Sequence, residues 1–251
     1  MEVLHTFFLF FGSLVANTLA ALSGGGAGLL QLPLLLFLGL PFSIALATHK
    51  VATVALGFGA ATKHIRAGTL NKWFTIFVVA SGSCGVIIGA NIILAVPGEY
   101  AEKALGILII GLAFFSHNKK ALGQYVSAKN RHWRGMLLGG AGLAIIGIIN
   151  GSLTAGSGLF VTLFLIWWFG FDYKQAVALT MVSVGLFWNA IGAFTIQFAG
   201  GEFYWPWLPV LLLASLFGGY LGAHLSQIHN NQVIKKAFEL LSLIVGIKLL
   251  L

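Results

Sequence analysis

Charged residues are scarce in this chain. Asp, Glu, Lys and Arg make up 8% of its 251 residues, whereas a soluble domain averages about 25%. With 59% hydrophobic residues, the chain has too little polar surface to coat a soluble globule. Its long apolar runs also lack the alternating polarity of a membrane β-barrel. The predicted fold class is therefore all-α, a polytopic membrane helix bundle of 8–10 hydrophobic segments.

Acidic residues and cysteine are rare enough to disfavour several kinds of chemistry. The six Asp and Glu residues, except Glu239, lie at the ends of apolar segments or between them. The single cysteine, Cys84, excludes an intrachain disulfide, and the histidines show no metal-ligand spacing with a cysteine or an acid. We expect no enzyme, no cofactor and no metal. The missing membrane carboxylate disfavours sodium coupling more than proton coupling.

The net charge of +8 would suggest nucleic acid as a partner if the chain were soluble. Here the Lys and Arg residues gather between apolar segments, above all in residues 62–72 and 117–134. Short basic loops favour the cytoplasmic side of a membrane. We therefore expect a multi-pass protein of a bacterial or archaeal inner membrane, in contact with the lipid bilayer and without a nucleic-acid partner.

The apolar segments differ in length. They cover residues 3–22, 27–38, 43–61, 73–95, 103–116, 135–149, 157–169, 175–198, 205–227 and 233–251. Five of them (the first, third, fourth, eighth and ninth) reach or approach the roughly 20 residues that a spanning helix needs. The short segments 27–38 and 157–169 each come directly after a glycine-containing break.

These two breaks are the most informative feature of the sequence. Ser23–Pro33 contains three consecutive glycines, and Asn150–Phe160 contains glycine together with Ser and Thr. Glycine permits positive φ angles, and non-helical backbone at membrane depth must be buried in protein or line a polar cavity. We predict that the two breaks build a substrate site. The alternative is that their glycines only allow helices to cross closely.

The second half of the chain resembles the first. Five landmarks recur at an offset of 130 to 133 residues, among them Gly28 with Gly158 and Gly85 with Gly218. The glycines of Gly85-x-x-x-Gly89 and Gly218-x-x-x-Gly222 are expected to let helices pack closely. The predicted organisation is a first membrane repeat at 1–116, a basic cytoplasmic linker at 117–134 and a second repeat at 135–251.

The orientation of the repeats depends on whether each glycine-broken pair of segments crosses the membrane once or twice. One crossing gives parallel repeats and leaves Lys103, Lys174, Lys235 and Lys236 outside. Two crossings give inverted repeats and leave only Lys103 and Lys248 outside, which the charge distribution favours. A 12-residue helix covers only about 18 Å, so the short segments are expected to be tilted or half-spanning.

Several motifs resemble the TauE/SafE family of sulfite exporters, also called the toluene-sulfonate uptake permease family. They are Ser23-Gly-Gly-Gly-Ala-Gly28 with Pro33, then Gly39-Leu40-Pro41, and Ala45-Leu-Ala-Thr-His-Lys50. The resemblance covers essentially the whole chain and implies transport of sulfite, sulfonates or other small organic anions. In the family an asparagine often precedes the lysine, whereas this chain has His49.

Lys50 is the strongest candidate for an anion-binding residue. It lies about eight residues inside an apolar segment, where a charge is rare and usually faces a cavity or a partner. The alternative is that its long stem reaches the outer interface. His49 could bind substrate or carry a proton, or simply bond a backbone carbonyl. Thr48 could likewise bond only its own helix.

The breaks would complete an anion site, because a helix start exposes N–H groups and favours negative charge. Together the candidate substrate-binding residues are Gly24, Gly25, Gly26, Gln31, Thr48, His49, Lys50, Ser152, Thr154, Gly156, Ser157 and Thr180. Ser183 and Asn189 are weaker candidates. Asn17 and Asn150 precede the breaks and are expected to bond either freed backbone groups or substrate.

The sequence thus predicts a secondary transporter of small anions that works by alternating access, with its site between the repeats. A passive anion channel is the main alternative. A membrane-embedded enzyme or assembly factor is a third, weakened by the missing acids and nucleophile. Which anion is carried, in which direction, whether protons are the coupling ion and what oligomer forms all stay open.

Overall fold

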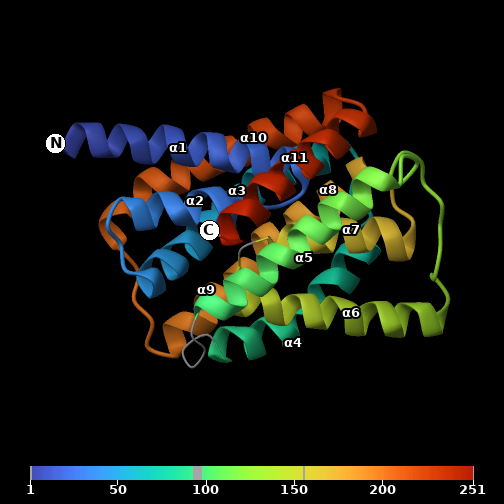
Figure 1. Cartoon of the computed structure of the whole chain (residues 1–251), viewed down its shortest axis with the longest axis horizontal. Coiled ribbons are helices and arrows are strands. Elements are labelled where there is room, and N and C mark those ends of the chain that lie inside the picture. The colour runs from blue at the N-terminus through green and yellow to red at the C-terminus, as the bar shows by residue number, and fades with distance from the viewer. Residues whose placement is uncertain (1, 93–97, 155, 251) are drawn as a thin grey trace.

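All regular elements among the described residues are helical, so the predicted all-α bundle is confirmed (Figure 1). The computed structural model describes residues 2–92, 98–154 and 156–250. Its first half contains α1 (Glu2–Ser23), α2 (Ala27–Phe37), α3 (Phe42–Arg66), α4 (Lys72–Ile92) and α5 (Gly98–Asn118). Its second half contains α6 (Trp133–Ser152), α7 (Ser157–Phe169), α8 (Tyr173–Thr180), the π-helix η1 (Met181–Trp188), α9 (Asn189–Phe198), the 3-10 turn η2 (Trp205–Trp207), α10 (Leu208–Ile228) and α11 (Asn231–Leu250).

Six helical stretches of the described chain are long and apolar enough to cross a membrane. Five of them, α1, α3, α4, the continuous α8–η1–α9 and η2–α10, match the five long segments predicted from the sequence. The sixth is α6. The predicted segment 73–95 runs past the end of α4, and its last three residues lie outside the described residues. The two segments after the breaks form the short helices α2 and α7, as expected.

Each broken pair of helices folds back on itself. Gly12 in the middle of α1 lies against Leu34 near the end of α2, so these two helices run antiparallel. In the second pair, the Ser127 N–H, just before α6, donates to the carbonyl of Gly170, just after α7, at 2.8 Å. The α6–α7 hairpin therefore enters and leaves at the same end of the molecule.

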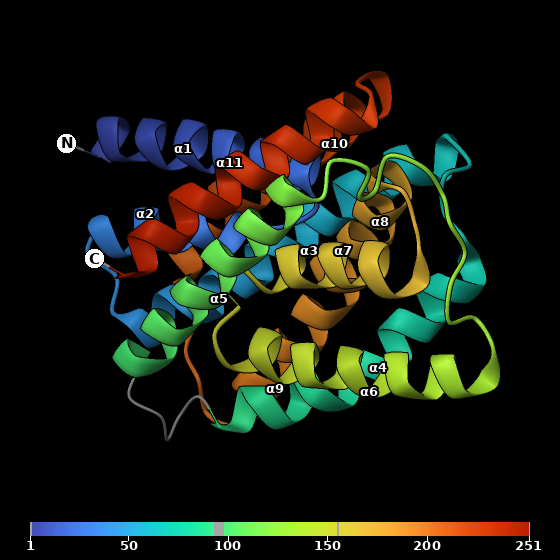
Figure 2. The same cartoon turned by 45° about the vertical axis from the view of Figure 1, so that its right-hand side comes forward.

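Corresponding helices of the two halves run in opposite directions. In Figure 1, α1 begins at the left, whereas α6 begins at the right where the linker reaches it. Helices α5 and α11 lie side by side in both views and also run oppositely (Figures 1 and 2). The most extensive packing joins a helix of one half to a helix of the other: α4 packs against α6, and α1 packs against α10. The opposite courses of these two helix pairs, α1 with α6 and α5 with α11, support the predicted inverted repeats, which stay a prediction.

The glycines predicted to allow close helix packing lie in these contacts between the two halves, which confirms that prediction. A Cβ added to Gly85 would overlap the α6 backbone at Ala144, and one added to Gly222 would overlap the α1 backbone at Thr18. Without side chains at these positions, the helix backbones can approach each other directly.

One end of the molecule collects the positive charge. Apart from Lys50, Lys103 and Lys248, all Lys and Arg residues lie in the 119–132 linker or at helix ends beside it. We call this the basic end.

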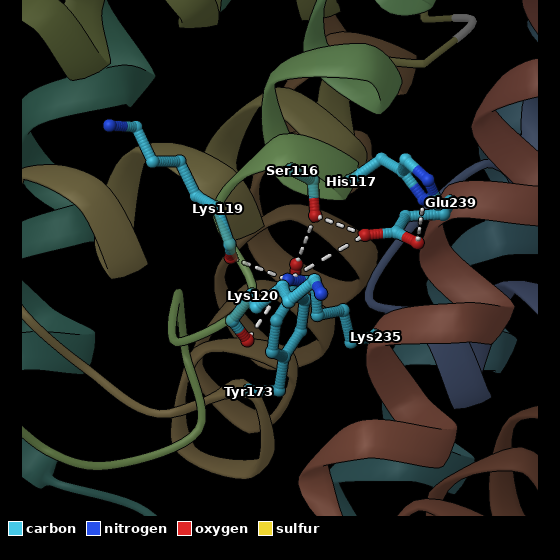
Figure 3. A network of polar contacts seen from close by, with 7 residues as sticks. All are labelled: Ser116, His117, Lys119, Lys120, Tyr173, Lys235 and Glu239. Carbon is cyan, nitrogen blue, oxygen red and sulfur yellow. Dashed lines mark hydrogen bonds and ion pairs between the residues drawn. The ribbon is translucent and has the colours of Figure 1, made fainter.

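A polar network ties the linker to α5, α8 and α11 there (Figure 3). The Ser116 hydroxyl lies 2.9 Å from the Tyr173 hydroxyl and donates to Glu239 Oε1 at 2.9 Å. The Lys235 ammonium donates to the Lys119 carbonyl at 2.6 Å. These contacts hold the ends of α5, α8 and α11 together at the basic end.

Candidate functional site

The two helix breaks meet inside the protein. Gly24, Gly25 and Gly26 all have positive φ angles of 86°, 147° and 94°. A Cβ on Gly25 would overlap the backbone of Gly158 in the second break, so the chains touch there main chain to main chain. The Thr162 hydroxyl of α7 donates to the Gly24 carbonyl at 2.6 Å. This bond satisfies a carbonyl that the break has freed from its helix.

Both short helices begin at this junction. Gly26 precedes α2 and Gly156 precedes α7, each in the left-handed conformation, and neither helix start has a side-chain cap. The first N–H groups of a helix have no partner within it, and the helix dipole adds partial positive charge. Two such helix starts therefore face the middle of the molecule, one from each half.

A small cavity of about 30 Å³ lies at the junction. It is lined mainly by residues of the two breaks, of α3 and of the π-helix and α9, among them Gly25, Gly26, His49, Thr154, Ser157 and Asn189. A cavity needs roughly 10–15 Å³ to hold one water, so this space fits about two. Three larger hollows are lined mainly by apolar residues. A fourth lies at the basic end, beside Arg131.

Lys50 lies beside this cavity and is completely buried. Its ammonium donates to the Asn150 carbonyl at 2.8 Å, and thus links α3 of the first half to the end of α6 in the second. The side chain does not extend to the outer interface, which was the alternative explanation for its position. Within the described part of the chain, no carboxylate pairs with it. An ammonium has three donors, so this charge retains capacity for an anion.

Asn150 organises the second break. Its side-chain amide donates to the Ser157 hydroxyl at 2.8 Å, and its carbonyl accepts from Thr154 Oγ1 at 3.1 Å as well as from Lys50. The Ser157 hydroxyl in turn donates to the Thr154 carbonyl at 2.9 Å. All three break residues are buried, and all line the cavity. The Asn150 side chain therefore bonds a side chain of the break and not the freed backbone groups that were expected.

His49 is held on the opposite wall by the first half. Its Nδ1 lies 2.8 Å from Gln31 Oε1, and Gln31 Nε2 donates to the Ser215 hydroxyl at 3.3 Å. Asn17 Nδ2 donates to the same hydroxyl at 3.0 Å. The chain of contacts is fully buried and joins α3, α2, α10 and α1. It leaves His49 Nε2 without a hydrogen-bond partner among the residues that the structure describes.

The π-helix forms the remaining wall. It is wider than an α-helix, and π-helical turns often occur at functional sites. Its Gly185 lies against Gly57 of α3, where a Cβ on Gly57 would overlap the π-helix backbone. Ser183 Oγ and Asn189 Oδ1 are buried, and no described residue forms a hydrogen bond with either atom. Polar atoms in this state usually bind water or a ligand.

The structure places the predicted site residues in three groups. Gly25, Gly26, His49, Thr154 and Ser157 line the cavity. A second group, Gly24, Gln31, Lys50 and Thr180, lies directly behind this lining and bonds to it or to the breaks.

The third group lies away from the cavity. Thr48 accepts a hydrogen bond from the Tyr204 N–H, and the Ser152 hydroxyl bonds back to the Ile148 carbonyl of its own helix. Gly156 caps α7 but faces Ile109 of α5. These three residues serve the packing around the break, because their polar groups are already used or point elsewhere.

Two residues that support the site escaped sequence analysis. Thr162 bridges the Gly24 carbonyl and Thr180, and Ser215 anchors Gln31. Both are small hydroxyl residues inside apolar runs, and a hydroxyl there gives no signal that separates it from one bonded to its own helix.

Comparison with known proteins agrees with this architecture. The sequence model described as "Sulfite exporter TauE/SafE" matches residues 9–249. The chain belongs to the TauE/SafE sulfite exporter family. The resemblance seen in its motifs is thereby confirmed, and the chain is a multi-pass membrane protein, in bacteria of the inner membrane.

Its curated relatives in this family are named as transporters. The "Probable membrane transporter protein ORF9" of a Sinorhizobium species is 26% identical over 97% of this chain and 91% of its own length. A "Probable membrane transporter protein" of Haemophilus influenzae is 25% identical over 96% of this chain and 92% of its own. "Probable membrane transporter protein YfcA" of Escherichia coli K12 is 24% identical, over 96% and 88%. No solved structure matches the chain.

Proposed function

We propose that this membrane transporter carries small anions, most specifically sulfite or organosulfonates, by alternating access between two inverted repeats. The observation that carries the proposal is the junction itself. Two uncapped helix starts, one from each half, face a buried cavity beside the ammonium of Lys50. Helix starts and lysine both favour negative charge. Nothing acidic among the described residues pairs with Lys50 to cancel the effect.

The donors at the junction suit an oxyanion that has several acceptor oxygens. Backbone N–H groups come from both helix starts. The hydroxyls of Thr154 and Ser157 line the same space and, by donating to the Asn150 and Thr154 carbonyls, hold the second break in place. Lys50 supplies a full positive charge in surroundings where charges interact more strongly than in water. The description of the family as sulfite exporters supports the sulfur oxyanions among possible substrates.

The antiparallel course of corresponding helices supports the inverted repeats. In transporters built this way the site lies at the repeat interface and is formed by broken helices. The cavity has room for about two waters, which favours a carrier that closes around its site over an open channel. Counterflow separates the two: unlabelled substrate on the far side accelerates uptake through a carrier and does nothing for a pore.

Replacing Lys50 by methionine tests the site. We expect the K50M variant to fold, because removing a buried charge that lacks a carboxylate partner leaves no unpaired charge behind. Ligand-induced stabilisation by sulfite, sulfate, thiosulfate, sulfoacetate or taurine should disappear. The measurement is the thermal unfolding of purified protein with and without each anion, since a ligand that binds the folded state raises its stability.

Lys129→Met is the matched control, because Lys129 lies in the linker and its side chain is exposed. K129M should retain the response of the parent protein to the same anion. If K50M is stabilised as strongly as the parent, Lys50 is not the anion-binding charge. If no anion in the panel stabilises the parent while neutral solutes do, the substrate class itself is wrong.

A further inference from the structure

His49 differs from every other polar group at the cavity in its titration chemistry. It is fully buried, it lines the cavity, and its Nε2 has no hydrogen-bond partner within the described ranges 2–92, 98–154 and 156–250. Its other ring nitrogen, Nδ1, lies 2.8 Å from Gln31 Oε1. A buried, unpartnered polar atom on a residue that lines a cavity points to a ligand.

The contacts of Gln31 decide which nitrogen of His49 carries the hydrogen. Gln31 Nε2 donates to the Ser215 hydroxyl, so its Oε1 faces His49 and can only accept. The neutral ring must therefore donate from Nδ1, which leaves the lone pair on Nε2. Gln31 fixes this tautomer, and it can equally accept from the charged ring after Nε2 has taken a proton.

The charges around His49 are few. Its neighbour on α3, Lys50, is the one titratable group among the described residues that faces it. The other elements packed around the site present polar groups that do not titrate near neutral pH: Asn17 on α1, Gln31 on α2, Asn150 on α6, Ser157 on α7, Asn189 on α9 and Ser215 on α10.

A proton on His49 would place a second positive charge beside Lys50. Two like charges a residue apart in a buried site repel each other, and burial adds to the cost. An anion in the cavity would offset both charges. Proton and anion would therefore each raise the affinity for the other, because coupling between two ligands is reciprocal.

We propose that His49 Nε2 is the proton-binding atom of this transporter, and that it takes up one proton together with each anion. The proposal rests on the anion-transport function proposed above. The proton comes from water on the side to which the site is open and binds to Nε2. The resulting Nε2–H group donates a hydrogen bond to the bound anion. It returns to water on the other side when the anion leaves. The coupled species is one anion with one proton.

Calorimetric titration tests the proposal. Purified protein is titrated with sulfite and, separately, with methanesulfonate, each in two buffers of different ionisation enthalpy, to count protons taken up per bound anion. The parent should exceed His49→Asn by about one proton, because any titration of the anion itself is the same in both proteins. With methanesulfonate, the parent Kd should rise with pH more steeply than that of H49N, by about tenfold per pH unit, because any titration of Lys50 is present in both proteins.

His64→Asn is the matched control. His64 also lies buried on α3 with an unpartnered Nε2, but it bonds Thr69 at the basic end and does not line the cavity. H64N should take up the same number of protons as the parent. An equal proton count in the parent and in H49N would overturn the proposal and leave the anion site intact. Absence of anion binding by the parent would instead overturn the proposed function and the coupling together.

Gln31→Glu provides a second variant that does not remove the imidazole. A carboxylate beside Nδ1 should hold His49 charged before the anion arrives. Anion binding by Q31E should then take up close to no proton while the anion still binds. A proton count like that of the parent would contradict the assignment to His49, even if H49N proves too unstable to purify.

Discussion

The two helix breaks turn the chain in the same way with different residues. In the first break, three successive glycines adopt positive φ angles and contribute no side chain of their own. In the second, Thr154 adopts a positive φ of 59° despite its side chain, and it bonds with Asn150 and Ser157. A positive φ in a β-branched residue is a genuine outlier. Such outliers persist only where surrounding contacts hold them.

The difference separates two tasks. The bare first break lets the backbone of the second approach to contact, whereas the second brings hydroxyl and amide groups to the cavity. Lys50 extends the asymmetry, because it comes from the first half and bonds the end of α6. In the first half, Asn17 precedes the break as Asn150 does in the second, but its side chain anchors Ser215. The glycines of the first break thus allow the close backbone contact, and the second break places polar side chains at the cavity.

The largest effect is expected from Gly25→Ala. The added Cβ would overlap the backbone of Gly158 and Leu159, and φ is unfavourable for alanine there. We expect more than about 4 kcal/mol of lost stability, enough to prevent recovery of folded protein. Gel filtration and thermal unfolding of the purified protein measure this.

Gly39→Ala is the control for backbone strain alone. Gly39 also has a positive φ, 97°, but a Cβ there would meet nothing within 4 Å. G39A should lower the free energy of unfolding by only about 1–2 kcal/mol. Equal stability of G25A and G39A would show that the breaks do not touch as described.

Thr162→Val removes the side-chain bond that joins the two breaks. The hydroxyl donates to the Gly24 carbonyl at 2.6 Å and lies 2.9 Å from Thr180 Oγ1. Leaving that buried carbonyl unsatisfied should cost about 1–3 kcal/mol in the free energy of unfolding. Thr195→Val is the control, because its hydroxyl bonds only Ile191 of its own helix. T195V should change the free energy of unfolding by less than about 0.5 kcal/mol. If both variants lose the same stability, the Thr162 bond between the two breaks is not what stabilises the junction.

Ser157→Ala and Ser23→Ala compare the chemistry of the two breaks directly. Ser157 lines the cavity and accepts from Asn150, whereas the Ser23 hydroxyl bonds backbone carbonyls of its own segment. S157A removes the hydroxyl that accepts from Asn150 and donates to the Thr154 carbonyl, so the second break loses two of its bonds and anion binding should weaken about tenfold. S23A should bind within about twofold of the parent on the same scale. Calorimetric titration measures the anion Kd of both variants. Equal increases in Kd would contradict the proposal that only the second break contributes side chains to the anion site.

Labelling of single cysteines tests the inverted arrangement with the smallest disturbance. In a Cys84→Ala background, cysteine is placed at Asp172 or at Glu202, which lie at opposite ends of the α8–η1–α9 stretch. Asp172 caps α8 through a bond to the Gln175 N–H, so its loss costs about 1 kcal/mol. An impermeant thiol reagent should reach position 172 only from the cytoplasmic side and position 202 only from outside. Finding position 202 cytoplasmic would contradict the inverted repeats.

Much of the fold follows from local sequence. The long apolar runs predicted the spanning helices, because a membrane leaves helices as the way to satisfy the backbone of such runs. The Gly85 and Gly218 motifs predicted where helices pack closely, because only small residues permit that approach. The division into two repeats with a linker at 117–134 stays a prediction, supported by the reversed course of the second half.

The candidate site was predictable only in outline. Glycine runs and a lysine in an apolar segment are visible in a sequence, so Gly25, His49 and Lys50 could be named. The roles of Thr48 and Ser152 could not be judged, because a hydroxyl that bonds its own helix looks like one that faces a ligand. Thr162 and Ser215 lie far along the chain from the groups they bond, and no local pattern identifies such partners.

The sequence by itself determined that this is a membrane helix bundle with two broken helices and one lysine deep in an apolar segment. These properties depend on composition and on the order of residues. The tertiary structure alone decided that the breaks touch, that Lys50 ends on the Asn150 carbonyl, and that Gln31 leaves the lone pair of His49 on Nε2. Those facts depend on which distant backbones come together, and that is settled by packing between the two halves.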